Sequence, residues 1–209
     1  MPSCENARYF DRTRRDARTE RGAQSAFDES LLGARGFDPQ GNRLGGITTP
    51  TQVIVPRGAV LIRTYGGPKA TPDGQWWFTV CELQTLLSYA GHDDLAQGRS
   101  QGRGLLHAFL AVLRVEWEST CEFYAVVALR RPLYAFHGEG DHALYAASGG
   151  QKAALMRVNG RQRGMRQLFL PRLWEYRAAL TWRVVRGNVD RGLVAEFGRA
   201  PVPRLPFEL

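Results

Sequence analysis

Short apolar runs separated by glycine and proline dominate the chain from residue 51 onward, and they predict a series of strands. The first two are QVIV and AVLIRTY, on either side of the turn Pro56-Arg57-Gly58. A loop rich in glycine and proline then leads into an aromatic strand over Gln75–Thr79. Two late strands are predicted at RQLFLP and TWRVVRG.

Helical spacing of apolar residues follows the aromatic strand. In VCELQTLLSYAG the leucines recur every three to four residues, Thr79 is placed to cap the start, and Gly91 is placed to end the helix. Shorter helices are predicted over 23–32 and within RLWEYRAAL, whereas LLHAFLAVLRVEW fits either a helix or a strand.

The segment Glu122–Phe136 is apolar on both faces and predicts a central strand interrupted at Pro132. Several short strands with two or three helices between them indicate an α+β fold with a strongly bent or split sheet and flanking helices. We expect residues 1–50, which lack a hydrophobic period, to form an arm or wrapping segment. Residues 51–198 then form the main domain, and 199–209 a proline-rich tail.

Charge is distributed unevenly along the 209 residues. Residues 151–209 contain twelve basic and four acidic side chains, which accounts for the whole net charge of +8 and favours a polyanionic ligand or an acidic partner. No run of roughly 18 apolar residues is present, so no membrane span or membrane partner is expected. The charged N-terminal sequence lacks the apolar core of a secretory signal, so we expect synthesis in the cytoplasm.

Three distant segments supply candidate chemistry. Arg63 leaves a buried strand beside Tyr65, the aromatic strand contains Trp77 and Phe78, and Gln167 lies on the late strand RQLFLP. A guanidinium can hold two phosphate oxygens, and aromatic rings can hold a base, so this set suits an anionic ligand that contains a ring.

The same order resembles the ADP-ribosyltransferase-like superfamily of NAD-cleaving enzymes. More narrowly, RTYGGPKATPDGQWWF, YAVVALRRPLYAFHGEG and RGMRQLFLP are similar to segments of NAD glycohydrolase toxins of the tuberculosis necrotizing toxin type. The resemblance covers about 60–186. It implies an ADP-ribosyltransferase-like catalytic domain over 51–198 and NAD as the substrate. It further implies a bacterial or phage toxin or effector, either cytoplasmic or delivered into a target cell by a non-classical route, with an immunity or antitoxin partner.

The resemblance also implies roles for individual residues. Arg63 and Gln167 become catalytic, with Arg63 holding the pyrophosphate and Gln167 fixing the ribose hydroxyls. The implied cofactor-binding set is Arg63, Thr64, Tyr65, Gly66, Trp77, Phe78 and Thr79. Because Gln-Leu-Phe stands where arginine-modifying transferases have two glutamates, hydrolysis by water, or transfer to another protein or nucleic-acid acceptor, is favoured over transfer to arginine.

Two other functions fit the residues. A basic nucleic-acid-binding module would use Trp174 or Tyr176 for stacking on bases. Its phosphate-binding arginines would be Arg157, Arg161, Arg163, Arg166, Arg172 and Arg177. A nuclease would use His137 or His142 with nearby carboxylates; the loop HGEGDH also has the composition of a metal site, although a polar turn is the preferred interpretation and no metal ligands are assigned.

Overall fold

The computed structural model describes residues 4–12, 25–37, 46–66, 71–96, 123–140, 166–186, 189–199 and 204–208. Within them, seven strands form one sheet in the order β1-β5-β6-β3-β2-β4-β7, and every neighbouring pair is antiparallel. The strands are β1 Thr51–Val55, β2 Val60–Tyr65, β3 Trp76–Thr79, β4 Phe123–Leu129, β5 Leu133–Glu139, β6 Arg166–Phe169 and β7 Leu180–Arg186. Together with the helices, this sheet confirms the α+β class.

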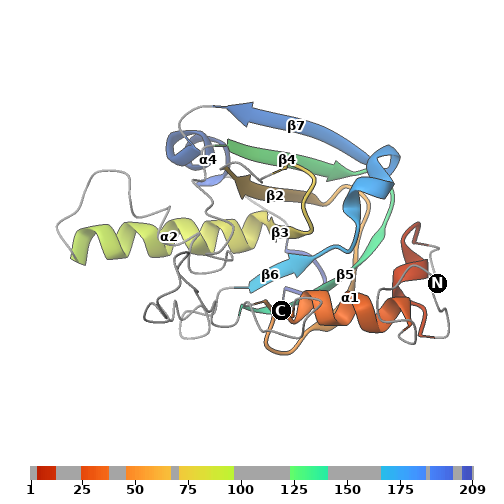
Figure 1. Ribbon diagram of the computed structural model, residues 1–209. Coiled ribbons are helices and arrows are strands. Elements are labelled where there is room, and N and C mark those ends of the chain that lie inside the picture. Colours follow the sequence, from red (N-terminus) through yellow and green to blue (C-terminus); the bar gives the residue numbers. More distant parts are fainter. Residues whose placement is uncertain are drawn as a thin grey trace, which may run out of the picture.

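The sheet is strongly curled because β3 is shared between two halves. Trp76 and Trp77 pair with β6, whereas Phe78 and Thr79 pair with β2 on the other side. In Figure 1 the β7-β4-β2 half lies above and the β6-β5 half below, with β3 joining them. A bent and divided sheet was predicted from the short strands, and the structure has one.

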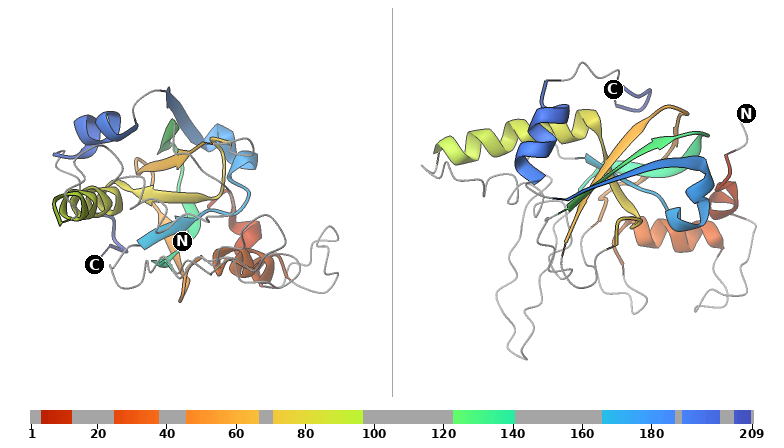
Figure 2. Two further views of the ribbon diagram at one scale, coloured as in Figure 1. Left: turned by 60° about the vertical axis from the view of Figure 1, so that its left-hand side comes forward. Right: turned by 90° about the horizontal axis from the view of Figure 1, so that it is seen from above.

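In the described part of the chain, four helical elements flank this sheet. They are the 3-10 helix η1 Ala7–Phe10, α1 Ala26–Ala34, α2 Val80–Ala96 and α4 Val189–Phe197. Figure 2 shows η1 and α1 gathered on one side of the molecule and α2 with α4 on another. A further 3-10 element, η4 Leu173–Ala179, connects β6 to β7. No helix among the described residues is long and apolar enough to cross a membrane.

Some predicted boundaries were wrong. The helix α2 continues five residues beyond Gly91 to Ala96, so this glycine does not end it. The central strand predicted over 122–136 is interrupted at Pro132 as expected, but its two parts are separate strands, β4 and β5, in different halves of the sheet. Pro132 lies in the tight connection between them, where its missing N–H removes no ladder hydrogen bond. The helix α4 was not predicted, and LLHAFLAVLRVEW lies outside the described residues.

The N-terminal segment is bound to the body of the protein. Asn6 donates to the carbonyl oxygen of Tyr134 and accepts from its backbone N–H, both at 2.8 Å. Phe10 packs on the rings of Tyr134 and Phe136. Residues 4–12 therefore pack directly against β5.

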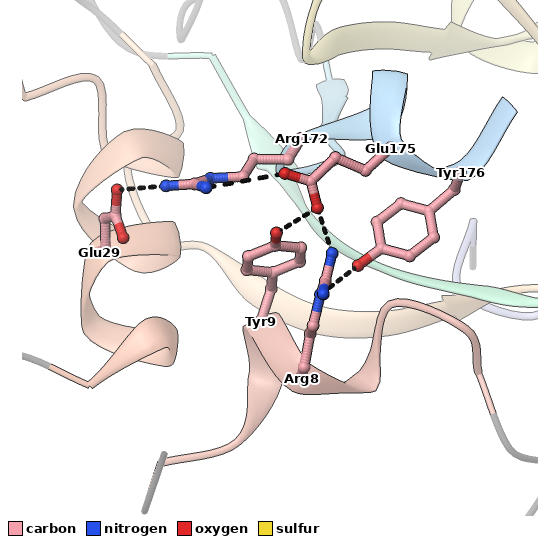
Figure 3. A network of polar contacts seen from close by, with 6 residues as sticks. All are labelled: Arg8, Tyr9, Glu29, Arg172, Glu175 and Tyr176. Carbon is pink, nitrogen blue, oxygen red and sulfur yellow. Dashed lines mark hydrogen bonds and ion pairs between the residues drawn. The ribbon is translucent and has the colours of Figure 1, made fainter. Parts of the chain in front are cut away.

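A polar network joins η1 to η4, as Figure 3 shows. The Glu175 carboxylate accepts from the Tyr9 hydroxyl at 2.5 Å and forms an ion pair with Arg8, whose Nε donates to Tyr176 at 2.9 Å. Burial, followed by the bond to Glu175, raises the pKa of Tyr9 above its usual value, so this hydroxyl keeps its proton. Arg172 contacts Glu175 from the opposite side and adopts a left-handed φ of 48°.

Candidate functional site

The three strands singled out by the sequence are consecutive neighbours in the sheet. The order β6-β3-β2 places the strand that carries Gln167 beside the aromatic strand, and the aromatic strand beside the one that carries Arg63. They meet where the sheet divides. The fold therefore places the three segments side by side, although Arg63 and Gln167 are about a hundred residues apart in the sequence.

Arg63 is buried beneath the segment that precedes β3. The residue is 7% exposed, Nε donates to the carbonyl oxygen of Thr71 at 3.3 Å, and Nη1 donates to that of Trp76 at 3.1 Å. Gly74 lies directly over the guanidinium, because a Cβ added there would be 2.2 Å from Arg63 Cζ. In this conformation Arg63 holds the 71–76 segment, and binding a pyrophosphate would require that segment to move.

The same segment is attached to η4 through Asp73. Burial raises the pKa of this carboxyl, but hydrogen bonds from Arg177 and Thr71 outweigh burial, so the pKa of Asp73 lies below its usual value. Arg177 forms an ion pair with it. The 71–76 segment is therefore held by Arg63 on one side and by Arg177 on the other.

Gln167 is buried on a different face from Arg63. The residue is 2% exposed, and Nε2 donates to the carbonyl oxygen of Gly46 at 3.3 Å. Paired residues share a face of the sheet, and successive residues alternate between its two faces. Leu168 pairs with Trp77, so Gln167 lies on the face opposite Trp77. Ile62 pairs with Phe78, so Arg63 lies on the same face as Trp77. The structure brings the two strands together but not the two side chains; their catalytic roles stay predictions.

The remaining residues of the implied cofactor set belong to the core. Trp77 donates through its indole Nε1 to the carbonyl oxygen of Gly74 at 2.7 Å and packs edge-on against Trp182. Tyr65 stacks on Phe123. The whole group is buried: Thr64, Tyr65, Gly66, Trp77, Phe78 and Thr79. No open ring surface for nicotinamide is present on them.

A buried acid–base pair lies at the start of α2. Thr79 caps this helix as predicted, since its hydroxyl accepts from the Glu82 N–H at 3.1 Å while Glu82 Oε2 accepts from the Thr79 N–H at 2.8 Å. The other carboxylate oxygen, Glu82 Oε1, lies 2.6 Å from His137 Nε2. Glu82 is 7% exposed and His137 3%, so the pair is almost completely desolvated.

Two cavities open beside this pair. The larger has a volume of about 480 Å³ and is lined by Thr48, Thr49, Thr51, Val53, His137, Gly138, Glu139, Arg166 and Phe207. The smaller, of about 160 Å³, is lined by Cys81, Glu82, Thr85, His137, Arg166, Arg204 and Glu208. Since His137 and Arg166 line both cavities, they are the centre of the candidate site.

The sequence suggests other roles for these residues. It offers His137 as a candidate for a metal or nuclease site and Arg166 as a candidate for nucleic-acid binding. It gives no functional role to Glu82. The signal for Glu82 was present as Thr-x-x-Glu before an apolar period. Nothing in the sequence indicates that the helix start lies against the end of β5, because residues 82 and 137 are joined only by the fold.

The structure also bears on the candidate metal site and on the candidate nucleic-acid-binding residues. Among the described residues, no group of three or more His, Cys, Asp or Glu side chains is placed to hold a metal, and Asp141 and His142 lie outside those residues. Tyr176 is buried in the polar network, which contradicts its predicted role in base stacking, whereas Trp174 is 43% exposed. Arg172 and Arg177 are engaged by carboxylates. Arg157, Arg161 and Arg163 are not described.

Comparison with known proteins finds only weak similarity. No protein-family model and no curated protein matches the sequence. Among solved structures, "Rhs1-CT in complex with cognate immunity protein RhsI1" aligns with a TM-score of 0.42 and 16% identity, over 76% of this chain and 95% of that chain. This similarity is too low to assign a family or a function.

Proposed function

We propose that this protein cleaves the nicotinamide–ribose bond of NAD. The observation that carries the proposal is the adjacency of β6, β3 and β2 at the division of the sheet, with cavities opening where β6 begins. The strands with the implied catalytic arginine, aromatic residues and glutamine are neighbours, although nothing in their sequence separation requires it.

The chemistry needs little from the protein beyond positioning and charge. As the C–N bond breaks, nicotinamide leaves as a neutral molecule and positive charge develops on the ribose, as in glycoside hydrolysis. Water then adds at the same carbon, which yields ADP-ribose, nicotinamide and a proton. Macromolecular acceptors could replace water, but Gln167-Leu168-Phe169 favours hydrolysis.

Glu82 suits the stabilisation of that positive charge. Its carboxylate lines the smaller cavity, and hydrogen bonds with His137 and the Thr79 N–H fix its orientation before a substrate arrives. A fixed negative charge in a water-poor site stabilises an oxocarbenium ion more strongly than the same charge in water. Gln167 acts either by turning from Gly46 toward the ligand or by positioning β6.

Nicotinamide release from NAD tests the proposal. The wild type is expected to release nicotinamide, and Gln167→Ala is expected to reduce its rate by about 100-fold or more, as for loss of one positioned polar group. The matched control is Arg57→Ala, which removes an exposed side chain of the β1-β2 turn and should leave the rate unchanged. Thermal melting of each variant confirms folding. Absence of release by the folded wild type overturns the proposal.

If NAD is cleaved, the resemblance further supports a toxin or effector role with a neutralising protein partner. Expression of the chain in bacteria, with and without Gln167→Ala, would then show growth inhibition that depends on Gln167. Normal growth together with measured intracellular NAD loss would separate the enzyme from the toxin role.

A second candidate function is metal-independent cleavage of RNA, favoured by the buried Glu82–His137 pair beside Arg166. An imidazole paired with a carboxylate can move a proton, and a guanidinium can stabilise a phosphorane-like charge. Incubation of RNA with the protein in excess chelator tests this function. Fragmentation that His137→Asn abolishes would support it, and intact RNA would exclude it.

A further inference from the structure

The larger cavity lies between the 46–51 segment and the paired ends of β5 and β6. The Thr48 N–H donates to the carbonyl oxygen of Glu139 at 3.0 Å, and Ile47 bridges to Gly140, so this segment runs along the end of β5. Arg166 begins β6 directly opposite Glu139. Backbone pairing on both sides therefore sets the positions of the cavity walls.

Two residues that line this cavity each have a buried polar atom without a hydrogen-bond partner. Arg166 Nε and Thr48 Oγ1 are both buried atoms without a hydrogen bond among the described residues. Buried polar groups are nearly always paired, because an unpaired one has lost water and gained nothing in return. Arg166 and Thr48 therefore each keep an unused polar atom next to one cavity, and a small rotation of either side chain would turn it toward an acceptor bound there.

The other residues that line the cavity indicate which chemical groups the ligand carries. Thr49 and Thr51 add hydroxyl donors next to Thr48, which together with a guanidinium form a phosphate-binding set. Glu139 lies beside Arg166 on the same wall, and its carboxylate can accept hydrogen bonds from sugar hydroxyls next to a phosphate.

An apolar surface completes the cavity. Val53 lies on its wall, and Phe207 lies there with its ring centroid 4.9 Å from that of His137. The ring is placed to contact a planar base. A volume of about 480 Å³ falls within the range of about 300–1,000 Å³ that small-molecule sites occupy.

We infer that this cavity binds a ribonucleoside phosphate, with Arg166 and Thr48 on the phosphate, Glu139 on the ribose hydroxyls and Phe207 beside the base. This inference deepens the proposed function and rests on it for the choice of a nucleotide among phosphorylated ligands. In this assignment Arg166 binds the phosphate in place of Arg63, because Gly74 covers the Arg63 guanidinium.

Calorimetric titration with ADP tests the site in the full-length protein. Arg166→Gln keeps a polar side chain but removes the charge, and it should weaken ADP binding at least about tenfold, as expected for a charge-assisted hydrogen bond. Thr48→Val is isosteric and should weaken binding several-fold. The control Arg57→Gln removes an equal charge outside the cavity and should bind as the wild type does.

A stability measurement distinguishes ligand binding from a structural role. Because Thr48→Val removes an unpaired buried hydroxyl, the unliganded variant should melt at the same or a higher temperature than the wild type while binding ADP less tightly. A lower melting temperature with unchanged ADP binding would make Thr48 structural and overturn its assignment.

The choice of ligand identifies the source of the phosphate. ADP should bind more tightly than adenosine, and a short RNA that competes with ADP would indicate a nucleic-acid substrate in the same cavity. Equal binding of ADP and adenosine, no ADP binding, or ADP binding unaffected by Arg166→Gln would each overturn the inference. Nicotinamide release is measured separately, so ADP binding without NAD cleavage would retain the site and reject the proposed function.

Discussion

Replacement of Glu82 by alanine is expected to lower the free energy of unfolding by about 3–5 kcal/mol, the range measured when one partner of a buried pair is removed. The carboxylate caps the first turn of α2 with one oxygen and contacts His137 with the other. Its loss leaves the Thr79 N–H and the His137 ring buried without their partner. Urea denaturation followed by circular dichroism measures the change.

The matched control for this prediction is Glu29→Ala. Glu29 is also an acidic residue in the first turn of a helix, but its side chain is 46% exposed and its ion pair with Arg172 spans 3.4 Å. Exposed ion pairs contribute about 0–1 kcal/mol, so this variant should be almost as stable as the wild type. Equal losses for both variants would show that Glu82 acts only through the general preference for acidic residues near a helix start.

The conservative variant Glu82→Gln separates stability from activity. Glutamine also serves at the third position of a capping box, so most of the stability should remain. The negative charge is lost, and nicotinamide release should fall by about 100-fold or more if that charge stabilises the oxocarbenium ion. A stable Glu82→Gln protein with wild-type release would remove Glu82 from the proposed chemistry.

Replacement of Gly74 by alanine is expected to destabilise the protein by about 2–4 kcal/mol, the combined effect of overpacking and lost hydrogen bonds from a charged group. The new Cβ would lie 2.2 Å from Arg63 Cζ and 2.3 Å from Nη2. The guanidinium is itself held by the carbonyl oxygens of Thr71 and Trp76 and cannot withdraw without breaking those bonds. Thermal and urea denaturation measure the effect.

Two comparisons isolate the steric cause. At Gly58 an added Cβ meets nothing within 4 Å, although φ is +84°, so Gly58→Ala should cost only the left-handed backbone term of about 1–2 kcal/mol. In an Arg63→Ala background, Gly74→Ala should cost far less than in the wild type because the clashing atoms are gone. Additive losses in that double variant would show that Gly74 does not pack on Arg63.

Much of the secondary structure could be predicted because local patterns determine it. Alternating and apolar runs located β1, β2, β3, β6 and β7, and Thr79 was recognised as a helix cap. The interruption at Pro132 was predicted, but not that the two parts lie in different halves of the sheet, because both are apolar and only their different partners distinguish them. The end of α2 was misplaced because a glycine within a helix costs only about 1 kcal/mol, which packing can offset.

The sequence alone determined the α+β class, the strand that carries Arg63, the aromatic strand before α2 and the strand that carries Gln167. Only the tertiary structure decided how these parts combine. Pairing made the three strands neighbours, but the two-residue period of a strand turned Arg63 and Gln167 to opposite faces. Long-range packing joined Glu82 to His137 and placed Arg166 beside both, since contacts between residues 55 and more apart leave no trace in local sequence.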